Sequence, residues 1–286
     1  MNLANPAIEA VQSKSAPQLV SFWQGPLDGI TYGCLATFPY NGAHLRLYAY
    51  EEIAVPPGVE LADAREICAD VSLVRRYIAD GKVEFSKFSN LFRYLLIEKT
   101  GNCWVDCDFV CLAHPNFHTE PMVFGYQLPH EHPGAINGAV LRLPSEHVVL
   151  QQLIEHARGV VDLDQNWGMI GPRLITPKLR EAGLAELARP SAEFYPIEAD
   201  EFWKPVLPEF HDTVTAAVKT SKLLHLWHHM FELAGYDKEL APPKGSYLHS
   251  WLERVGAIDR FKGVYGSEEM SEQLKSWMPS SLQTAG

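Results

Sequence analysis

The stretch FSKFSNLFRYLLIEKTGNCWVDCDFVCL, residues 85 to 112, decides how the middle of this chain folds. Its hydrophobic residues recur at helical spacing between positions 88 and 96, and Gly101 stands where a left-handed residue commonly ends a helix. The apolar run that follows is typical of a buried strand. Because that strand carries Asp106 and Asp108 in its middle, the stretch predicts a helix-to-strand unit whose two carboxylates need a partner.

Strand and helix patterns alternate on both sides of this unit. Strands are predicted at residues 18 to 26, 43 to 52, 103 to 112, 122 to 127 and 135 to 143. Helices are predicted before the Asn41-Gly42 turn and at residues 61 to 68, 72 to 81, 85 to 100, 145 to 156, 177 to 186 and 221 to 234, followed by a helical tail. This alternation indicates an α/β sandwich.

The composition limits the classes of partner. The formal net charge is -11, from 35 acidic and 24 basic residues, which argues against a surface that captures nucleic acid by neutralising phosphates. An acidic protein that binds a phosphorylated ligand needs a metal ion or a local basic residue to offset the repulsion. We therefore expect no nucleic-acid partner.

The cysteines and the N-terminal stretch bear on the compartment. The chain has 5 cysteines, and three of them fall within one predicted strand at intervals of four, which is neither a disulfide framework nor a zinc pattern. No basic and apolar leader precedes residue 18, and no apolar window approaches the length of a membrane span. We expect a soluble, cytoplasmic protein with reduced thiols.

The two aspartates are expected to act as a pair. Residues two apart in a strand project to the same face, so the carboxylates of Asp106 and Asp108 should lie side by side. A hard divalent cation such as Mg²⁺ or Mn²⁺ removes their repulsion and keeps positions for water and substrate phosphates. For an Asp-x-Asp pair alone, the alternative is a strand end that turns into solvent with Asp108 in the turn.

The wider segment SNLFRYLLIEKTGNCWVDCDFVCL, residues 89 to 112, resembles the core motif of the DXD-containing sugar transferases of glycosyltransferase family 32 and the related α-1,4-galactosyltransferases. In that motif, a Ser-Asp-x-x-Arg-Tyr helix leads through Gly-Gly-x-Tyr-x-Asp-x-Asp. This chain has Asn102 for the second glycine and Trp104 for the tyrosine. The resemblance implies a GT-A-type nucleotide-sugar-binding sandwich with a central mixed sheet and helical C-terminal additions.

The resemblance also implies roles for the matching residues. Asp106 and Asp108 match the pair that holds Mn²⁺ or Mg²⁺ on the nucleotide diphosphate, and Arg93 matches the helix arginine near the donor sugar and phosphates. Asn90 takes the place of the sugar-binding aspartate. Its amide can hydrogen-bond sugar hydroxyls, but it supplies no negative charge near a developing oxocarbenium ion. These four residues form the expected catalytic set.

Three further segments are similar to family elements more loosely. SFWQG matches a first-strand segment whose tryptophan lies against uracil, so Trp23 is expected to stack on the base. NWGMIGPRLIT matches a segment that approaches donor and acceptor, which points to Gly171, and HLWHHMF matches a late element near the phosphates, which points to His225. With Trp104 these residues form the expected cofactor-binding set. The plainer alternatives are a core tryptophan, a Gly-Pro pair that only starts a helix, and a histidine on an amphipathic helix.

The implied activity is metal-dependent, retaining transfer of a hexose from a UDP-sugar to a glycan or glycolipid acceptor in polysaccharide biosynthesis. One alternative is a nucleotide-sugar-binding homologue that has lost transfer, which Asn90 favours. Another is a haloacid-dehalogenase-type phosphatase, whose nucleophile strand also reads apolar-Asp-x-Asp. That motif usually continues with Gly-Thr, whereas Phe109 and Val110 follow here.

The chain is expected to divide into three parts. Residues 1 to 17 form an N-terminal extension, residues 18 to 235 the GT-A-like domain, and residues 236 to 286 a helical C-terminal extension. No transmembrane anchor is expected. A peripheral membrane contact through Trp251 or Trp277 stays open, and the alternative is that both tryptophans belong to the core.

Overall fold

The computed structural model describes residues 18–79, 81–127, 134–164 and 168–281. The predicted N-terminal extension, residues 1–17, therefore lies outside the described residues.

Six strands of the described residues form one mixed sheet in the order β3-β2-β1-β6-β9-β8. The strands are β1 (Leu19–Phe22), β2 (Leu45–Ala49), β3 (Val59–Asp63), β6 (Cys103–Val105), β8 (Val123–Tyr126) and β9 (Ile136–Arg142). β3, β2, β1 and β6 run parallel, and β9 is antiparallel to both β6 and β8. The predicted α/β fold with a central mixed sheet is confirmed.

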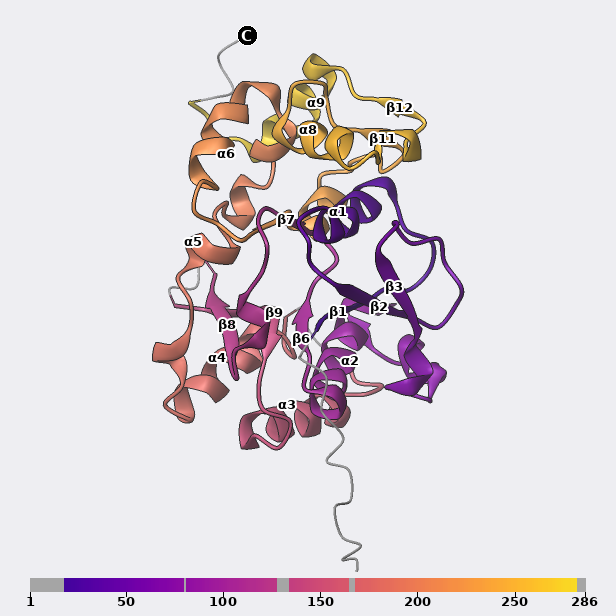
Figure 1. Cartoon of the computed structure of the whole chain (residues 1–286), viewed down its shortest axis with the longest axis vertical. Coiled ribbons are helices and arrows are strands. Elements are labelled where there is room, and N and C mark those ends of the chain that lie inside the picture. Colours follow the sequence, from indigo (N-terminus) through magenta and orange to yellow (C-terminus); the bar gives the residue numbers. More distant parts are fainter. Residues whose placement is uncertain (1–17, 80, 128–133, 165–167, 282–286) are drawn as a thin grey trace, which may run out of the picture.

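A hydrophobic core lies on each face of the sheet. Figure 1 shows helices on both sides of the sheet. On one face, Leu19 of β1 packs with the helix α1 (Gly29–Tyr40) and with much of the C-terminal part of the chain. On the other face, Val20 and Phe22 pack with α2 (Phe85–Thr100), α3 (Val148–Gly159) and α4 (Pro172–Glu181). This division follows from the strand pattern, because alternate residues of β1 point to opposite faces.

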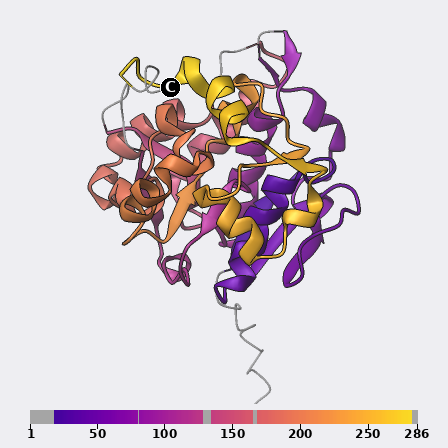
Figure 2. The same ribbon diagram turned by 90° about the horizontal axis from the view of Figure 1, so that it is seen from above.

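The C-terminal part packs directly on α1, as the view from above also shows (Figure 2). It contains α8 (Tyr247–Arg254), α9 (Ser267–Leu274) and the strand pair β11 (Leu240–Ala241) and β12 (Gly263–Val264). The packing is so close that a Cβ at Gly33 would lie 2.2 Å from a methyl carbon of Leu252. Trp251 is buried in this core, and Trp277 packs edge-on against Phe202. The proposed boundary between residues 235 and 236 stays a prediction.

The predicted strand of residues 103 to 112 is wrong in its middle. The chain leaves β6 after Val105, turns at Asp106–Asp108, and continues as β7 (Phe109–Cys111) outside the main sheet. β7 pairs antiparallel with β10 (Leu223–His225), so a partner far along the chain fixes the break.

That pairing also corrects the predicted helix of residues 221 to 234. Its first part is β10, and only α7 (His228–Leu233) is helical. Between them Trp227 has φ 56°, a left-handed conformation that is uncommon for a residue other than glycine and that no helix continues through. The hydrophobic spacing fitted a helix, but the strand pairing decides the structure.

Other predicted boundaries move by a few residues. Residues 59–63 form β3, and only short 3-10 turns (Ala64–Glu66 and Val71–Arg75) follow where two helices were predicted. β4 (Ile78–Ala79) and β5 (Lys82–Val83) form a small hairpin before α2.

The starts of α3 and α4 also differ from the predictions. α3 is capped by His147 and not by Ser145. α4 begins at Pro172, five residues earlier than predicted, because proline is well suited to the first position of a helix. The short helices α5 (Ser191–Phe194) and α6 (His211–Ala217) complete the set.

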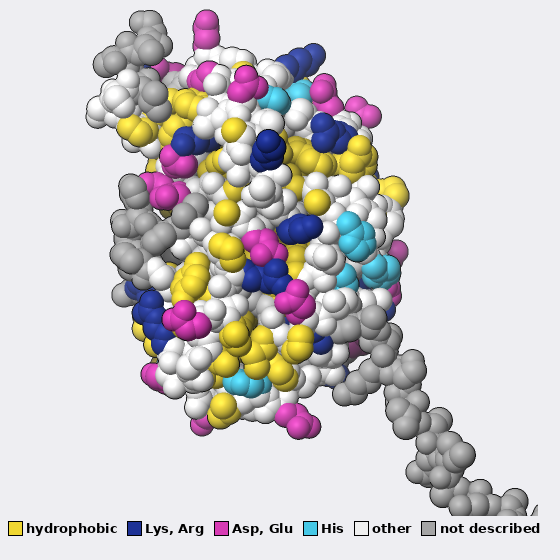
Figure 3. Space-filling model, turned by 60° about the vertical axis from the view of Figure 1, so that its left-hand side comes forward, with side chains coloured by type: hydrophobic (Ala, Val, Ile, Leu, Met, Phe, Trp, Pro, Cys, Tyr) yellow, Lys and Arg dark blue, Asp and Glu magenta, His cyan; other side chains and the backbone are white. Residues whose placement is uncertain are grey.

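The surface matches the composition. Acidic, basic and apolar side chains are interspersed on the face shown in Figure 3. The expectation of no nucleic-acid partner stays a prediction. Among the described residues, no helix combines the length and the apolar character needed to cross a bilayer.

Candidate functional site

The candidate site lies at the carboxyl edge of the parallel strands. β1 has β2 on one side and β6 on the other, and the helices that lead to these two neighbours cover opposite faces of the sheet. Such a switch point leaves a crevice outside the carboxyl ends of the strands, where α/β proteins bind their ligands. Trp23 directly follows β1 and Asp106 directly follows β6, so both residues stand at this edge.

Asp106 is held by side chains that come from its own segment. Its Oδ1 accepts hydrogen bonds from Arg93 Nη2 at 2.7 Å and from Trp104 Nε1 at 2.5 Å. The Arg93 guanidinium also lies 4.9 Å from the centre of the Trp104 ring. Among the described residues, Asp106 Oδ2 has no hydrogen-bond partner. One carboxylate oxygen is therefore fixed by the protein, and the other is available to a ligand.

Arg93 reaches Asp106 only because β9 leaves room for it. A Cβ on Gly138 would lie 2.6 Å from Arg93 Nη1, so a larger residue there would displace the guanidinium. The Arg93 side chain is 7% exposed, and a charge so deeply buried needs a partner. Burial raises the pKa of Asp106 above its ordinary value and the nearby Asp108 adds to this, while the charge of Arg93 opposes both.

Asp108 is held by the turn that joins β10 to α7. Its backbone carbonyl accepts from the N–H of Leu226 at 3.0 Å, and its Oδ2 accepts from the N–H of His228 at 2.9 Å. His225 Nε2 lies 3.2 Å from Oδ1. The left-handed Trp227 lets the backbone wrap around the carboxylate in this way. Burial acts to raise the pKa of Asp108, but the charge and hydrogen bond of His225 and the N–H of His228 outweigh it and hold that pKa below its ordinary value.

Asp106, Asp108 and His225 form a group that could hold a metal ion. Each residue offers one ligand atom, and these atoms lie within 4.8 Å of one another. The imidazole of His225 is fixed against the rings of Phe109 and Trp227, at centroid distances of 4.6 and 4.2 Å. Two carboxylates and an imidazole suit a cation such as Mn²⁺, so the residues fit the predicted metal.

Strand pairing brings His225 to this group. It was predicted near the phosphates or the metal, with a surface or core position on an amphipathic helix as the alternative. His225 lies in the group that could hold a metal, and it is the last residue of β10, opposite Phe109 of β7, and not part of a helix. Asp108 does lie in a turn, as the plainer alternative supposed. Its side chain is only 14% exposed, however, and it faces Asp106 and His225 rather than solvent.

Trp23 and His228 form a second layer of the site. Their rings are nearly parallel, with an interplanar angle of 13° and centroids 6.3 Å apart. Trp23 is partly buried and its Nε1 donates to the carbonyl of Pro26. His228 Nε2 lies 3.4 Å from the carboxylate of Asp28, which also caps α1. Sequence reasoning missed Asp28, whose only local signal is its place before a helix.

Asn90 and Gly171 lie next to each other beside Arg93. Asn90 is one turn before Arg93 on the same face of α2, and a Cβ at Gly171 would be 3.5 Å from Asn90 Oδ1. Asn90 Nδ2 donates to the carbonyl of Ser86. Gly171 caps α4 before Pro172, so it does start a helix, as the plainer alternative supposed, while also bordering Asn90.

Trp104 stands behind the site. Its side chain is fully buried in the core between the sheet and α2, and its only polar atom donates to Asp106. The part that the structure gives Trp104 is therefore to orient a carboxylate. The predicted role of Trp104 in binding the sugar donor stays a prediction.

Comparisons with known proteins give likenesses in structure only. No family model matches the sequence, and no curated protein matches it. The solved structure of the PaToxG glycosyltransferase is similar over 58% of this chain and 69% of its own, with 15% identity and a TM-score of 0.41. The WbbM bifunctional glycosyltransferase, in its apo structure, is similar over 93% of this chain, with 13% identity and a TM-score of 0.45. This chain spans 53% of the WbbM chain. Membership of family 32 stays a prediction.

Proposed function

We propose that this chain is a metal-dependent glycosyltransferase of the GT-A type, which transfers a hexose from a UDP-sugar to a glycan or glycolipid acceptor. The observation that supports this most is the convergence of Asp106, Asp108 and His225 at the switch point of the sheet, with Arg93 bonded to one of the carboxylates. The sequence resemblance of residues 89 to 112 supports the same reading.

The proposed metal site uses the oxygens and nitrogen that the fold leaves facing one another. Asp106 contributes Oδ2, because Arg93 and Trp104 already occupy Oδ1. Asp108 and His225 contribute the atoms that now face each other at 3.2 Å. When bound, Mn²⁺ or Mg²⁺ supplies positive charge at the diphosphate of the donor. This meets the need set by a net charge of -11, which would otherwise repel a phosphorylated ligand.

The remaining residues bind and orient the donor. Trp23 offers its ring to the nucleobase at the end of β1. The guanidinium of Arg93 pairs with Asp106 and so places a positive charge beside the proposed metal site. This charge helps to stabilise the negative charge that develops on the leaving diphosphate. Asn90 orients sugar hydroxyls through its amide. In the proposed transfer the bond from the anomeric carbon to the diphosphate breaks and the acceptor oxygen bonds to the same face of that carbon, so the configuration is retained. On that face the leaving phosphate oxygen can accept the proton of the acceptor hydroxyl.

A nucleotide-sugar-binding protein without transfer is the second candidate, and Asn90 is the observation in its favour. The amide is neutral, and its Nδ2 already donates to the carbonyl of Ser86. It therefore offers no carboxylate to stabilise positive charge on the sugar in the transition state. In this case the same site binds the donor and releases it unchanged.

Release of UDP from a set of UDP-hexoses, with and without an acceptor glycan, tests the proposal. We expect release with Mn²⁺, none with EDTA, and a loss of about 100-fold or more in Asp108→Asn. The matched control is Asp212→Asn, which changes a fully exposed carboxylate on α6 and should leave the rate unchanged. UDP binding without release would select the second candidate, and hydrolysis of a phosphate monoester would select a phosphatase.

A further inference from the structure

Buried polar atoms without a hydrogen-bond partner gather near the acidic site. Among the described residues that are not exposed, six buried side-chain atoms have no partner: Gln24 Oε1, Arg46 Nε, Arg93 Nε, His225 Nδ1, His228 Nε2 and His249 Nε2. Arg93, His225 and His228 already belong to the candidate site, and Gln24 directly follows Trp23. Because buried polar groups are almost always paired, this concentration indicates that a polar ligand binds at the carboxyl edge of the sheet.

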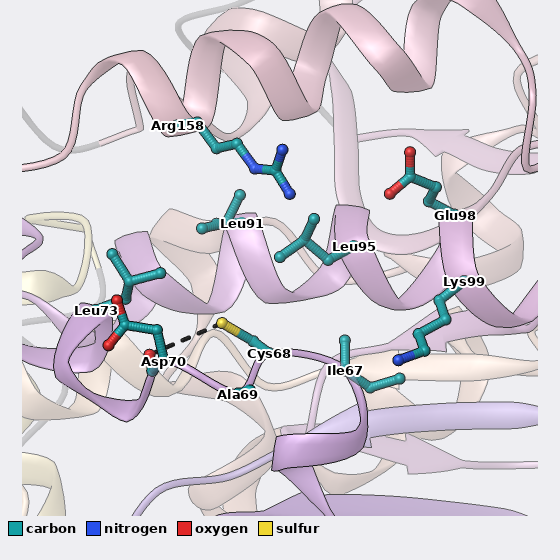
Figure 4. A pocket seen from close by; sticks show the side chains of 10 residues that line it. All are labelled: Ile67, Cys68, Ala69, Asp70, Leu73, Leu91, Leu95, Glu98, Lys99 and Arg158. Atoms are coloured by element: carbon teal, nitrogen blue, oxygen red, sulfur yellow. Dashed lines mark hydrogen bonds between the residues drawn. The ribbon is translucent and has the colours of Figure 1, made fainter.

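The cavity on the outer side of α2 has no such feature (Figure 4). Its volume is about 510 Å³, and its lining comes from the segment before α2, from α2 and from α3. None of the six unpaired atoms belongs to a residue that lines it. Its charged side chains also balance, because Asp70 and Glu98 face the same space as Lys99 and Arg158. The unpaired groups therefore point to the edge of the sheet and not to this cavity.

Gln24 lies at that edge, on the same face of the sheet as Asp106. The register of β1 and β6, continued by two residues beyond its last pair, sets Phe22 beside Asp106. The chain is still paired after β1 ends, since the N–H of Trp23 donates to the carbonyl of Tyr48 at 3.0 Å. Alternate residues share a face, so Gln24 follows Phe22 on the α2 side, next to Trp23 in the chain.

The carboxamide of Gln24 is free to bind a ligand. Within the described ranges, neither its Oε1 nor its Nε2 makes a hydrogen bond, whereas Gln127 Oε1 accepts from Asn137 at 3.0 Å. Oε1 is enclosed but the residue as a whole is only partly buried, so the other end of the amide is the accessible one. Rotation of the amide about its last side-chain bond exchanges the oxygen and the nitrogen, so the accessible end can accept or donate.

A hydroxyl group suits this amide, because a hydroxyl also both donates and accepts. In a nucleotide the ribose, with its two hydroxyls, joins the base to the diphosphate. The proposed donor site places the base on Trp23 and the diphosphate at the metal held by Asp106. These two residues follow neighbouring strands, which lie about 4.8 Å apart, and Gln24 is at the same edge. The ribose is therefore the part of the donor that Gln24 can reach.

We propose that the carboxamide of Gln24 binds a ribose hydroxyl of the nucleotide and so selects a ribonucleotide over a deoxyribonucleotide donor. The proposal rests on the proposed function, because it takes a nucleotide to be the ligand of the acidic site. It adds a residue that recognises the pentose, beside those proposed for the base, the metal and the hexose.

Calorimetric titration with UDP, 2′-deoxy-UDP and 3′-deoxy-UDP in Mn²⁺, on the wild type and on Gln24→Met, tests the proposal. Methionine has a similar length but neither donates nor accepts as an amide does. We expect at least one deoxy compound to bind the wild type about tenfold more weakly than UDP. In Gln24→Met, UDP itself should bind about tenfold more weakly, and both deoxy compounds should bind within about threefold of UDP.

Two controls separate this contact from an effect on folding. Gln151→Met changes an exposed glutamine on α3 and should keep the wild-type preference for UDP. Because the Gln24 amide has no partner in the described part of the chain, ligand-free Gln24→Met should unfold at no lower urea concentration than the wild type.

Two results would overturn this proposal and leave the proposed function intact. One is equal binding of UDP and both deoxy compounds by the wild type. The other is the same preference for UDP in the wild type and in Gln24→Met, which would assign the hydroxyl contact to another group. A folded wild-type chain that binds no UDP in Mn²⁺ would overturn the proposed donor and this proposal with it.

Discussion

The two carboxylates of the candidate site are held in different ways. Asp106 depends on two side chains, Arg93 and Trp104, which lie 13 and 2 residues before it in the chain. Asp108 depends largely on the backbone of a turn more than a hundred residues later, and among the described residues His225 is the side chain that pairs with it. Substitutions should therefore disturb Asp106 strongly, whereas Asp108 should tolerate changes in the side chains of its turn.

Replacing Arg93 should have the largest effect on stability. Arg93→Met keeps the length of the side chain but leaves the carboxylate of Asp106, 27% exposed, without its cation. Breaking a buried pair from one side costs about 3 kcal/mol, and urea unfolding measures that loss. The matched control is Arg76→Met, which breaks the exposed pair with Asp162 and should cost less than about 1 kcal/mol. Equal losses of unfolding free energy in both variants would contradict the view that Arg93 and Asp106 form a buried ion pair.

Replacing Trp104 should have a smaller effect on the same carboxylate. Trp104→Phe keeps an aromatic ring beneath Arg93 and removes the N–H that Asp106 accepts, and it leaves a small cavity because the phenyl ring is smaller than the buried indole. A hydrogen bond to a charged group contributes about 1.5 kcal/mol or more. The free energy of unfolding should fall by about that amount, and Mn²⁺ affinity should fall about tenfold, because Asp106 is less well oriented. An unchanged metal affinity would mean that Trp104 only fills space.

Replacing the side chain of His228 should leave Asp108 in place. His228→Ala keeps the backbone N–H that Asp108 Oδ2 accepts and removes the imidazole that contacts Trp23 and Asp28. We expect Mn²⁺ affinity within threefold of the wild type. The stability loss should be about 1 kcal/mol, because the carboxylate of Asp28 is only 15% exposed but keeps the N–H of Thr31 as a partner. Loss of metal binding in this variant would show that the side chain of His228, and not only its backbone N–H, holds Asp108 in place.

The smallest effect concerns the end of α7, the helix that follows this turn. Hydrogen bonds from His229 and Lys238 lower the pKa of Glu232 to about 2 from its ordinary value of 4.5. Because the folded-state value is the lower one, this contribution is complete above pH 4.5 and is lost as the pH falls towards 2. Glu232→Gln should be about 0.5 kcal/mol less stable at pH 6 and equal to the wild type near pH 2. Unfolding curves across this range would show a constant difference if the pairing is absent.

The local half of the site could be predicted from the sequence. Helical spacing and Gly101 placed α2 correctly, and the strand after it begins at Cys103 as expected. Short sequence separation explains this success, because Arg93, Trp104 and Asp106 are brought together by one helix and one turn. The sequence did not show that the strand ends before Asp106, because apolar residues stand on both sides of the two aspartates as far as Cys111.

The distant half could be predicted only in part. The sequence singled out His225 by resemblance, but the helix predicted around it conceals the pairing of β10 with β7 that brings it to Asp108. The left-handed Trp227 has no signal in its residue type, since glycine or asparagine is usual there. Asp28 and Gly138 take part only through contacts with residues far along the chain.

UDP binding measured by calorimetry, with Mn²⁺ and then with EDTA, on the wild type and on Asp108→Asn, tests the central claim most directly. The account predicts saturable binding by the wild type with Mn²⁺, and none with EDTA or in Asp108→Asn. Binding that persists in EDTA, or that is unchanged in Asp108→Asn, would contradict a metal site built on this carboxylate.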